Sequence, residues 1–438
     1  MYLSVDDTDS PKGLCTTFLA TEIIGSVDLD LIGYPRLVRL NPAVPWKTRG
    51  NGSLSLKFGY GTGKKIKIGR IKNRDIFCFE KQKTREPDPK ELLDSVIPIT
   101  EKFRQKDSDS GLIVSSVKPS RSFYTKGVRT IVKREEIDKE IKRIGALTHT
   151  WGNGRGLTGS LCGMAWRPGD RTFELIAYRP EKRWGTERIF DSESIGRMDS
   201  SFSSTFNSWE PRFHKVAMIP ATPCPVMYGL RGDDPSVLFP ASETVVTEDL
   251  ERKMIFLTNQ GTDDHIIRNP KIPTPMSSYY IEGTVKSVKR IEGGHVFVTI
   301  ETKYGKLECA AYEPSKEFRY LFDWLCPGDS IGVMGELREE PRTLNIEKVK
   351  VISVVPEISK ISNPVCPGCG KTMESVGKDK GYRCRRCRTF SEKPVTEEKV
   401  RQVVPGWYEP PVAARRHLSK PLKRMGVCQP VEFVNGRT

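Results

Sequence analysis

The chain has 438 residues, with 71 Lys or Arg against 55 Asp or Glu, a formal net charge of +16 and a pI near 9.3. This length suits about three domains with buried cores, and no stretch approaches the ~18 apolar residues of a membrane-spanning helix. A helical membrane protein is therefore excluded. The positive charge indicates nucleic acid as a partner, although a generally basic proteome would give the same total.

The distribution of the eleven cysteines and the pattern at the start of the chain both indicate the cytoplasm. Only four cysteines are clustered, between residues 366 and 387, and the others are scattered as reduced thiols typically are. The chain begins with a strand pattern rather than a basic, apolar signal peptide. We therefore expect a cytoplasmic protein, and nothing in the sequence indicates a protein partner or a membrane.

The first seventeen residues hold the densest chemical pattern. A short apolar strand at residues 2–5 runs into Asp6, Asp7 and Asp9, and Cys15-Thr16-Thr17 opens an apolar helix. Carboxylates at the end of a strand and before a helix N-terminus are typical of a site for phosphate and Mg²⁺. An acidic turn with a helix cap would give the same spacing, so the pattern leaves both interpretations open.

The rest of residues 1–145 predicts one α/β domain. Residues 29–40 predict a strand and a loop, residues 53–60 alternate as a strand does, and residues 86–106 and 131–145 predict helices. Between the two strands lies a loop at 41–52, with Lys47, Arg49 and several polar donors, which suits either a phosphate or an ordinary surface loop. Residues 61–65 lack the spacing of a Walker A loop. Residues 118–129 are basic with aromatics, as in an RNA-binding segment or a solvated strand edge.

Residues 146–272 predict a second α/β or α+β domain. Residues 154–159 match GxGxxG but lack the preceding strand and the later acidic residue of a dinucleotide site, so we reject NAD as a ligand. The glycine-rich helix start could still bind a phosphate or allow another backbone to approach closely. Two strands end in polar loops that hold Asp233, Asp234, Asp263 and Asp264. These carboxylates suit a cationic substrate or the capping of turns, and His265 is more typical of a structural residue.

The C-terminal third predicts two nucleic-acid modules. Five short strands at 277–356, with a helix at 318–325, indicate an OB-fold, although another small barrel fits too. Cys366, Cys369, Cys384 and Cys387 then form two CxxC pairs, which predict a structural zinc ribbon at 361–392. Disulfides or a redox dithiol are weaker alternatives.

Positive charge is concentrated from residue 361 onward, where 16 Lys or Arg face 7 Asp or Glu. A basic tail at 393–438 follows the ribbon, and this region either contacts RNA phosphates or is a disordered tail. The side chains predicted to contact RNA are Arg385, Arg386, Arg388, Arg415, Arg416 and Lys420.

Five of these segments resemble one known family. DDTDS at 6–10 with GLCTT at 13–17, NPAVPWKTRGNG at 41–52, YGLRGD at 228–233, TNQGTDDH at 258–265 and the C-terminal segment are similar to the archaeal tRNA-isoleucine agmatidine synthetases. The departures are Pro11-Lys12, Leu14, Leu230 and Asp233. The resemblance implies a kinase-like α/β domain, a ferredoxin-like agmatine-binding domain, an OB-fold and a zinc ribbon.

The resemblance also implies the reaction. The family attaches agmatine to C2 of the wobble cytidine of the second isoleucine tRNA, which has a CAU anticodon. The reaction proceeds through a phosphorylated cytidine and cleaves ATP to AMP and phosphate. Flipping the base into the pocket would expose C2. The implied cofactors are ATP, Mg²⁺ and structural Zn²⁺.

The resemblance assigns site residues by position. Asp6, Asp7 and Asp9 would hold Mg²⁺ and the triphosphate, Thr16 matches a threonine that becomes phosphorylated, and Lys47 and Arg49 would neutralise charge. The residues expected to contact ATP or phosphate are Ser10, Gly13, Thr17, Thr48, Gly50 and Asn51. Agmatine would meet one of Asp233, Asp234, Asp263 and Asp264.

Two other functions remain compatible with the residues. A non-catalytic RNA-binding protein would use the OB-fold and the ribbon alone, but three clustered carboxylates would repel RNA phosphates without a metal. A kinase acting on another RNA or small molecule is disfavoured only by the TNQGTDDH resemblance.

Overall fold

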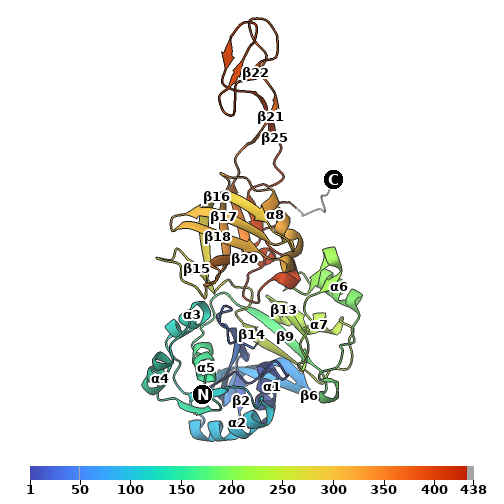
Figure 1. Ribbon diagram of the computed structural model, residues 1–438. Coiled ribbons are helices and arrows are strands. Elements are labelled where there is room, and N and C mark those ends of the chain that lie inside the picture. The colour runs from blue at the N-terminus through green and yellow to red at the C-terminus, as the bar shows by residue number, and fades with distance from the viewer. Residues whose placement is uncertain (49, 432–438) are drawn as a thin grey trace.

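One long sheet runs through the lower body of the molecule (Figure 1). The computed structural model describes residues 1–48 and 50–431. The sheet has twelve strands in the order β10-β13-β9-β14-β5-β6-β2-β4-β1-β7-β8, with β3 paired to β14 and β4. The strands are β1 (Tyr2–Asp6), β2 (Asp30–Ile32), β3 (Arg36–Arg39), β4 (Gly52–Gly59), β5 (Gly61–Ile71), β6 (Arg74–Gln82), β7 (Gly111–Ser115), β8 (Leu147–Thr150), β9 (Thr172–Tyr178), β10 (Thr205–Phe206), β13 (Val226–Gly232) and β14 (Arg252–Thr258).

Helices cover this sheet and bury its apolar strands. Leu3, Val5 and Leu54 are fully buried, as expected where both faces of a strand are covered. The helices are α1 (Thr16–Ser26), α2 (Pro89–Phe103), α3 (Arg121–Arg129), α4 (Arg134–Arg143), α5 (Gly156–Met164), α6 (Ser192–Ser201) and α7 (Leu238–Glu243), with 3₁₀ turns η1 (Glu181–Arg183), η2 (Pro211–Phe213) and η3 (Pro235–Val237). A small ribbon adds β11 (Trp209–Glu210) and β12 (Lys215–Val216).

The basic segment at 118–129 is helical. Ser120 caps α3 by accepting a hydrogen bond from the Ser122 N–H, and Tyr124 is buried. The strand-edge interpretation of this segment is therefore wrong. The basic and aromatic residues of this segment instead form an amphipathic helix that packs against α5.

The glycine-rich start of α5 allows a close approach to β1. A Cβ on Gly159 would lie 1.5 Å from Oδ2 of Asp6, and a Cβ on Gly156 would lie 2.6 Å from the Asp6 carbonyl oxygen. The helix can touch the strand only because both side chains are absent. This confirms the close backbone approach predicted for residues 154–159. The predicted domain boundary after residue 145 places α5 in the second domain, although the helix packs on β1, β4 and β7 of the first. The boundary stays a prediction.

A β-barrel sits on the body. Its strands are β15 (Ile266–Arg268), β16 (Ser277–Arg290), β17 (Val296–Thr302), β18 (Gly305–Ala311), β19 (Ser330–Leu337), β20 (Thr343–Ser353) and β26 (Gly406–Tyr408), with the turn η4 (Glu313–Arg319) and α8 (Tyr320–Asp323). The β16–β19 pairing closes the barrel. The five predicted strands and the helix between the third and fourth are confirmed.

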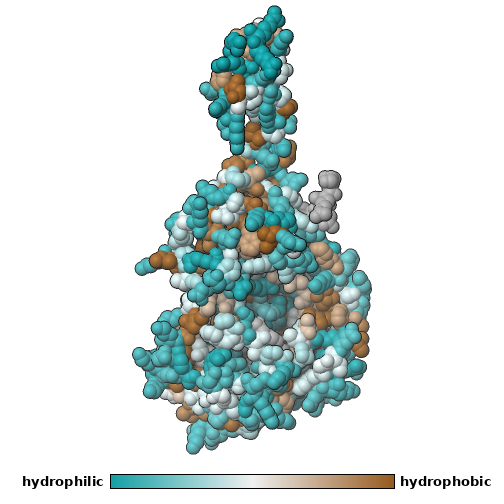
Figure 2. All heavy atoms as spheres, in the orientation of Figure 1, coloured by the Kyte–Doolittle hydropathy of each residue, from teal (hydrophilic) through white to brown (hydrophobic). Residues whose placement is uncertain are grey.

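A narrow arm extends from the barrel (Figures 1 and 2). Its stalk is the two-stranded ribbon β21 (Glu357–Ser362) and β25 (Val395–Lys399), and its tip holds β22 (Glu374–Ser375), β23 (Tyr382–Arg383) and β24 (Phe390–Ser391). Only Cys366, Met373 and Cys384 form a buried cluster among the described residues of the tip. The tip has too small an apolar core to fold without help.

After the arm, the chain returns to the body. It passes through β26 on the barrel, then η5 (Val412–Ala414) and α9 (Leu422–Met425). The His417 carbonyl accepts from the Gly261 N–H and the Leu418 carbonyl from the Asp263 N–H, both at 2.8 Å. Residues 415–425, which we call the return segment, therefore lie against the loop that follows β14.

A buried polar cluster joins body, barrel and return segment. Lys348 Nζ lies 2.9 Å from Oδ2 of Asp263, and Glu347 accepts from His265 at 2.9 Å and lies 3.2 Å from Nε of Arg416. Burial would raise the pKa of Glu347, but the charges of Arg416 and His265 outweigh it and hold that pKa at about 2. We call these five residues the joint.

Each helix within residues 1–48 and 50–431 is too short or too polar to cross a membrane.

Candidate functional site

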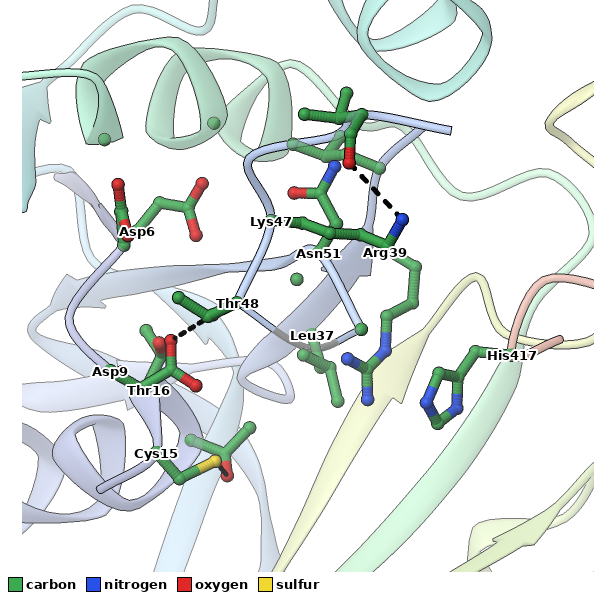
Figure 3. Close-up of a pocket in the computed structure, with 18 of the residues that line it drawn as sticks. Asp6, Asp9, Cys15, Thr16, Leu37, Arg39, Lys47, Thr48, Asn51 and His417 are labelled. Atoms are coloured by element: carbon green, nitrogen blue, oxygen red, sulfur yellow. Dashed lines mark hydrogen bonds between the residues drawn. The ribbon is translucent and has the colours of Figure 1, made fainter. Parts of the chain in front are cut away.

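A cavity of about 560 Å³ opens beside the end of β1 (Figure 3). It collects side chains from segments that are far apart in the chain. Its lining includes Asp6, Asp7, Asp9, Cys15, Thr16, Thr17, Leu37, Arg39, Val44, Trp46, Lys47, Thr48, Gly50, Asn51, Arg155, Gly159, Glu174, Arg231 and His417.

One side of the cavity is acidic. Asp6 ends β1, and Asp7 and Asp9 follow; we call these three the acidic triad. Burial and then the charge of Asp7 raise the pKa of Asp6 to about 8. Burial and then the charges of Asp109 and Asp9 raise the pKa of Asp7 to about 6. Crowded, buried carboxylates of this kind are stabilised by a bound cation.

The N-terminus of α1 faces the acidic triad. Thr16 and Thr17 are the first two residues of the helix, and Cys15 before them makes no side-chain cap. The Thr8 hydroxyl donates to Oγ1 of Thr16 at 3.1 Å. Free N–H groups and the positive end of the helix dipole favour phosphate at this point.

The loop at 41–52 forms another part of the lining. Thr48 Oγ1 donates to Oδ1 of Asp9 at 3.0 Å, and the Lys47 ammonium donates to the carbonyls of Pro42 and Val44. Gly50 and Asn51 also line the cavity, whereas Arg49 lies outside the described residues. Ser10 and Gly13 instead bond to each other through their backbones.

The opposite side of the cavity is basic, and sequence reasoning missed it. Arg39, Arg231 and His417, which we call the basic wall, come from β3, β13 and the return segment (Figure 3). Arg231 Nε donates to Glu174 at 3.0 Å, and its Nη2 donates to Nδ1 of His417 at 3.1 Å. A charged residue within the apolar β9, as Glu174 is, was the available signal.

The four predicted agmatine-binding aspartates lie outside this lining. Asp233 pairs with Arg424 at 2.7 Å, and Asp234 caps η3. Asp263 pairs with Lys348, and Asp264 accepts from the Tyr124 hydroxyl at 2.5 Å. Their role toward agmatine stays a prediction, while Glu174 is the further carboxylate that lines the cavity.

The predicted tRNA-contacting residues fall into two groups. Arg385, Arg386 and Arg388 are exposed on the arm, and Arg385 pairs with the exposed Glu374. Arg415, Arg416 and Lys420 belong to the return segment and pair with carboxylates inside the molecule, including Glu409, Glu336 and Asp170. Contacts with tRNA stay a prediction for both groups.

The four paired cysteines meet at the tip of the arm. Sulfur atoms of Cys366, Cys369, Cys384 and Cys387 all lie within 4.8 Å of one another. Each pair sits in a tight knuckle, closed by Gly370 at φ +69° and by Arg388 at φ +60°. Four thiolates at this spacing suit tetrahedral Zn²⁺ and leave no open position for catalysis.

Four family models match successive parts of the chain. They are the TiaS TCKD domain at residues 2–153, the TiaS FLD domain at 154–265, an OB-fold nucleic acid binding domain at 279–354 and the TiaS C-terminal zinc ribbon domain at 363–403. The predicted fold class, a mixed α/β body with an OB-fold and a zinc ribbon, is thereby confirmed.

Similar proteins match nearly the whole chain. TiaS of Archaeoglobus fulgidus, a 2-agmatinylcytidine synthetase of the second isoleucine tRNA, is 39% identical over 98% of both chains. A structure of TiaS in complex with that tRNA and ATP is 36% identical with a TM-score of 0.83, covering 97% of both chains. A complex of TiaS with the tRNA, AMPCPP and agmatine is 34% identical with a TM-score of 0.81, again over 97% of both. The family predicted from the motifs is confirmed, and this chain belongs to the TiaS family of isoleucine-tRNA 2-agmatinylcytidine synthetases.

Proposed function

We propose that this protein is an ATP-dependent 2-agmatinylcytidine synthetase of the second isoleucine tRNA. It attaches agmatine to C2 of the wobble cytidine in the CAU anticodon, through a phosphorylated cytidine. The supporting observation is the cavity itself, in which the acidic triad and the N-terminus of α1 face one another within a chain that matches TiaS proteins over nearly its whole length.

The acidic triad fits Mg²⁺. Hard carboxylate oxygens are the ligands that Mg²⁺ prefers. Burial, and then the charges of neighbouring carboxylates, raise the pKa of Asp6 and of Asp7, so a bound cation would stabilise their charged forms. When bound, the ion neutralises charge on the phosphates of ATP. Asp6, Asp7 and Asp9 would hold it.

The residues around the triad position the phosphates. We assign that role to the backbone N–H groups at Thr16 and Thr17, and to Lys47, Thr48, Gly50 and Asn51 of the 41–52 loop. Thr16 is also the residue proposed to become phosphorylated, since its hydroxyl lies on the cavity and bonds to Thr8. Ser10 and Gly13 act indirectly by fixing the turn between β1 and α1.

Activation followed by displacement explains the need for ATP. The carbonyl oxygen at C2 is a very poor leaving group, whereas its phosphorylated form leaves as phosphate. The amine of agmatine then bonds to C2. We add Glu174 to the candidates for binding the cationic substrate, because it lines the cavity, whereas Asp233, Asp234, Asp263 and Asp264 lie outside that lining.

The barrel and the arm supply affinity for the RNA. Exposed arginines on a zinc-stabilised tip can follow phosphates without reading sequence. This arrangement leaves chemistry to the body and capture to the arm. We propose the second isoleucine tRNA as the RNA partner on the strength of the relatives' names.

The test is mass spectrometry of a transcript of the isoleucine tRNA with a CAU anticodon, after incubation with the protein, ATP, Mg²⁺ and agmatine. The expected result is a gain of one agmatine less one water at the wobble cytidine. Reactions without ATP, and a transcript with uridine at the wobble position, are the controls. Tight binding with no mass gain would instead favour the non-catalytic RNA-binding function.

A further inference from the structure

Arg39 lines the cavity, and its guanidinium makes no hydrogen bond within residues 1–48 and 50–431. Its Nε atom is buried and makes no hydrogen bond, and no residue that the structure describes bonds to the rest of its guanidinium. Arg231, by contrast, is paired with Glu174. Among the described residues, therefore, Arg231 has an ion-pair partner and Arg39 has none.

His417 presents a hydrogen-bond donor to the same space. Arginine can only donate, so the 3.1 Å contact from Arg231 makes Nδ1 of His417 an acceptor. The neutral ring then carries its proton on Nε2. The surrounding protein, and then the charges of Arg39 and Arg231, lower the pKa of His417 well below its usual value, which keeps the ring neutral.

Gly50 brings the two donors to one point. A Cβ on Gly50 would lie 2.6 Å from Nη1 of Arg39 and 3.2 Å from Nε2 of His417. Both groups therefore reach the same small volume, and Gly50 leaves it free. Figure 3 shows the Arg39 guanidinium directed toward the His417 ring, with Asp6, Asp9 and Thr16 on the other side of the cavity.

We propose that Arg39 and His417, with Arg231 behind them, form an anion subsite that receives the phosphate displaced from the activated cytidine. A delocalised guanidinium beside a neutral N–H donor suits a phosphate group. The subsite binds it without a metal, whereas the acidic triad would repel phosphate without one. This inference rests on the proposed function.

The chemistry places such a subsite beside the amine. The amine nitrogen gives its lone pair to C2, the C2–O bond breaks, and its electron pair leaves on the oxygen of the departing phosphate. The proton lost by the nitrogen passes to that phosphate, which departs as HPO₄²⁻. The nucleophile and the leaving group meet at one carbon. Glu174 can therefore hold the cationic substrate while the neighbouring anion subsite holds the departing phosphate. Arg39 Nη1 and Arg231 are positioned to stabilise the charge that develops on the leaving oxygen.

The first experiment isolates the subsite from the acidic triad. Inorganic phosphate is titrated into the full-length protein in EDTA by calorimetry, for the wild type, Arg39→Gln, Arg39→Lys and His417→Ala. We expect Arg39→Gln to weaken phosphate binding by about tenfold or more, His417→Ala by a few-fold, and Arg39→Lys to restore part of the loss. Arg70→Gln, an exposed arginine on β5, is the matched control for charge.

The second experiment separates two sources of phosphate. Binding of the tRNA transcript without ATP should change by less than about twofold in Arg39→Gln. With ATP and Mg²⁺ but no agmatine, the variant should accumulate phosphorylated RNA as the wild type does, and conversion after adding agmatine should be slower. A loss of RNA affinity with normal phosphate binding would assign the subsite to an RNA backbone phosphate and overturn the leaving-group role.

The outcome is separable from the proposed function. If the wild type modifies tRNA but binds no phosphate in EDTA, or if all variants bind it equally, the anion subsite is refuted and the function stands. If the wild type modifies no tRNA, the function itself fails. Circular dichroism and zinc content of each variant identify any that misfolds, and Arg39→Lys then provides the conservative comparison.

Discussion

The body and the arm differ in how much apolar surface stabilises them. The body buries long apolar strands on both faces of a twelve-stranded sheet, and it uses this rigidity to hold carboxylates whose charges repel each other. The described part of the arm buries only three residues at its tip, and its stalk exposes Ile358, Ile361 and Val395. Chemistry that needs buried charge therefore lies in the part with a large core, and the RNA capture that we propose for the arm lies in a part whose small core needs a metal to fold.

The comparison predicts that zinc removal unfolds the arm and spares the body. Replacing Cys366 and Cys369 by serine should release the metal, because zinc binding contributes about 10 kcal/mol or more to small ribbon modules. Zinc content should fall from one ion per chain to near zero, tRNA affinity should drop, and the melting temperature of the body should stay unchanged. Cys428→Ser, at an exposed cysteine outside the cluster, is the control. Unchanged zinc content would refute the four-thiolate site.

Asp7→Ala should separate chemistry from binding. Loss of one metal-binding carboxylate should lower product formation by more than about a thousandfold, or about 4 kcal/mol, because charge on the phosphates is no longer neutralised. The affinity for tRNA should stay within a few-fold, as measured by filter binding. Asp75→Ala on β6, where an exposed aspartate pairs with Lys67, controls for loss of a carboxylate. A large loss of tRNA affinity would contradict the assignment of the acidic triad to ATP and Mg²⁺.

The joint should hold the two parts together. Lys348→Met leaves Asp263 in the joint without its ion-pair partner, which should cost about 3 kcal/mol and lower the melting temperature by roughly 5 °C or more. Adding Asp263→Asn should recover part of the loss, because the unpaired charge is removed while asparagine tolerates the positive φ of 61° and can still accept from the Lys420 N–H. Lys350→Met, two residues further along β20, should have little effect. Equal melting temperatures for all three variants would show that body and barrel are stable independently of the joint.

Single arginines on the arm should have the smallest effect. Arg385 is 84% exposed and pairs with an exposed carboxylate, so Arg385→Gln should leave stability within about 0.5 kcal/mol. The affinity for tRNA should fall about threefold. The slope of log affinity against log salt should become shallower by about one, as expected for the loss of one phosphate contact. The same salt series on Lys64→Gln in β5 tests whether the body contributes equally. A matching change there would remove the division of labour between arm and body.

Local patterns predicted individual elements well, because hydrophobic periodicity, capping residues and cysteine spacing can each be recognised within a short stretch of sequence. The alternating strands of the barrel, the capped helix α2 and the two CxxC pairs were all recognisable in the sequence. The single sheet through both α/β units was not. The pairing of β14 with β5 and with β3 joins residues roughly two hundred positions apart, and no local pattern encodes such a choice.

The site was predictable on its acidic side and hidden on its basic side. Asp6, Asp7 and Asp9 are close together in the chain, and Thr16 follows soon after them, so the motif carries its own geometry. Arg39, Glu174 and His417 are single residues in three separate segments. Glu174 stands out only as a charged residue within an apolar strand, and the neighbours of Arg39 and His417 do not distinguish these two from the many other charged residues of the chain.

The return segment has a consequence for the order of synthesis. The ribosome translates the acidic triad long before His417, which comes after the ribbon. A nascent chain on the ribosome therefore carries the triad but lacks one side of the reaction cavity, and it gains that side only when residues 415–425 dock against the loop after β14. The enzyme cannot assemble its complete cavity before the arm has been translated, so a chain cut short anywhere in the ribbon lacks His417 and part of the cavity lining.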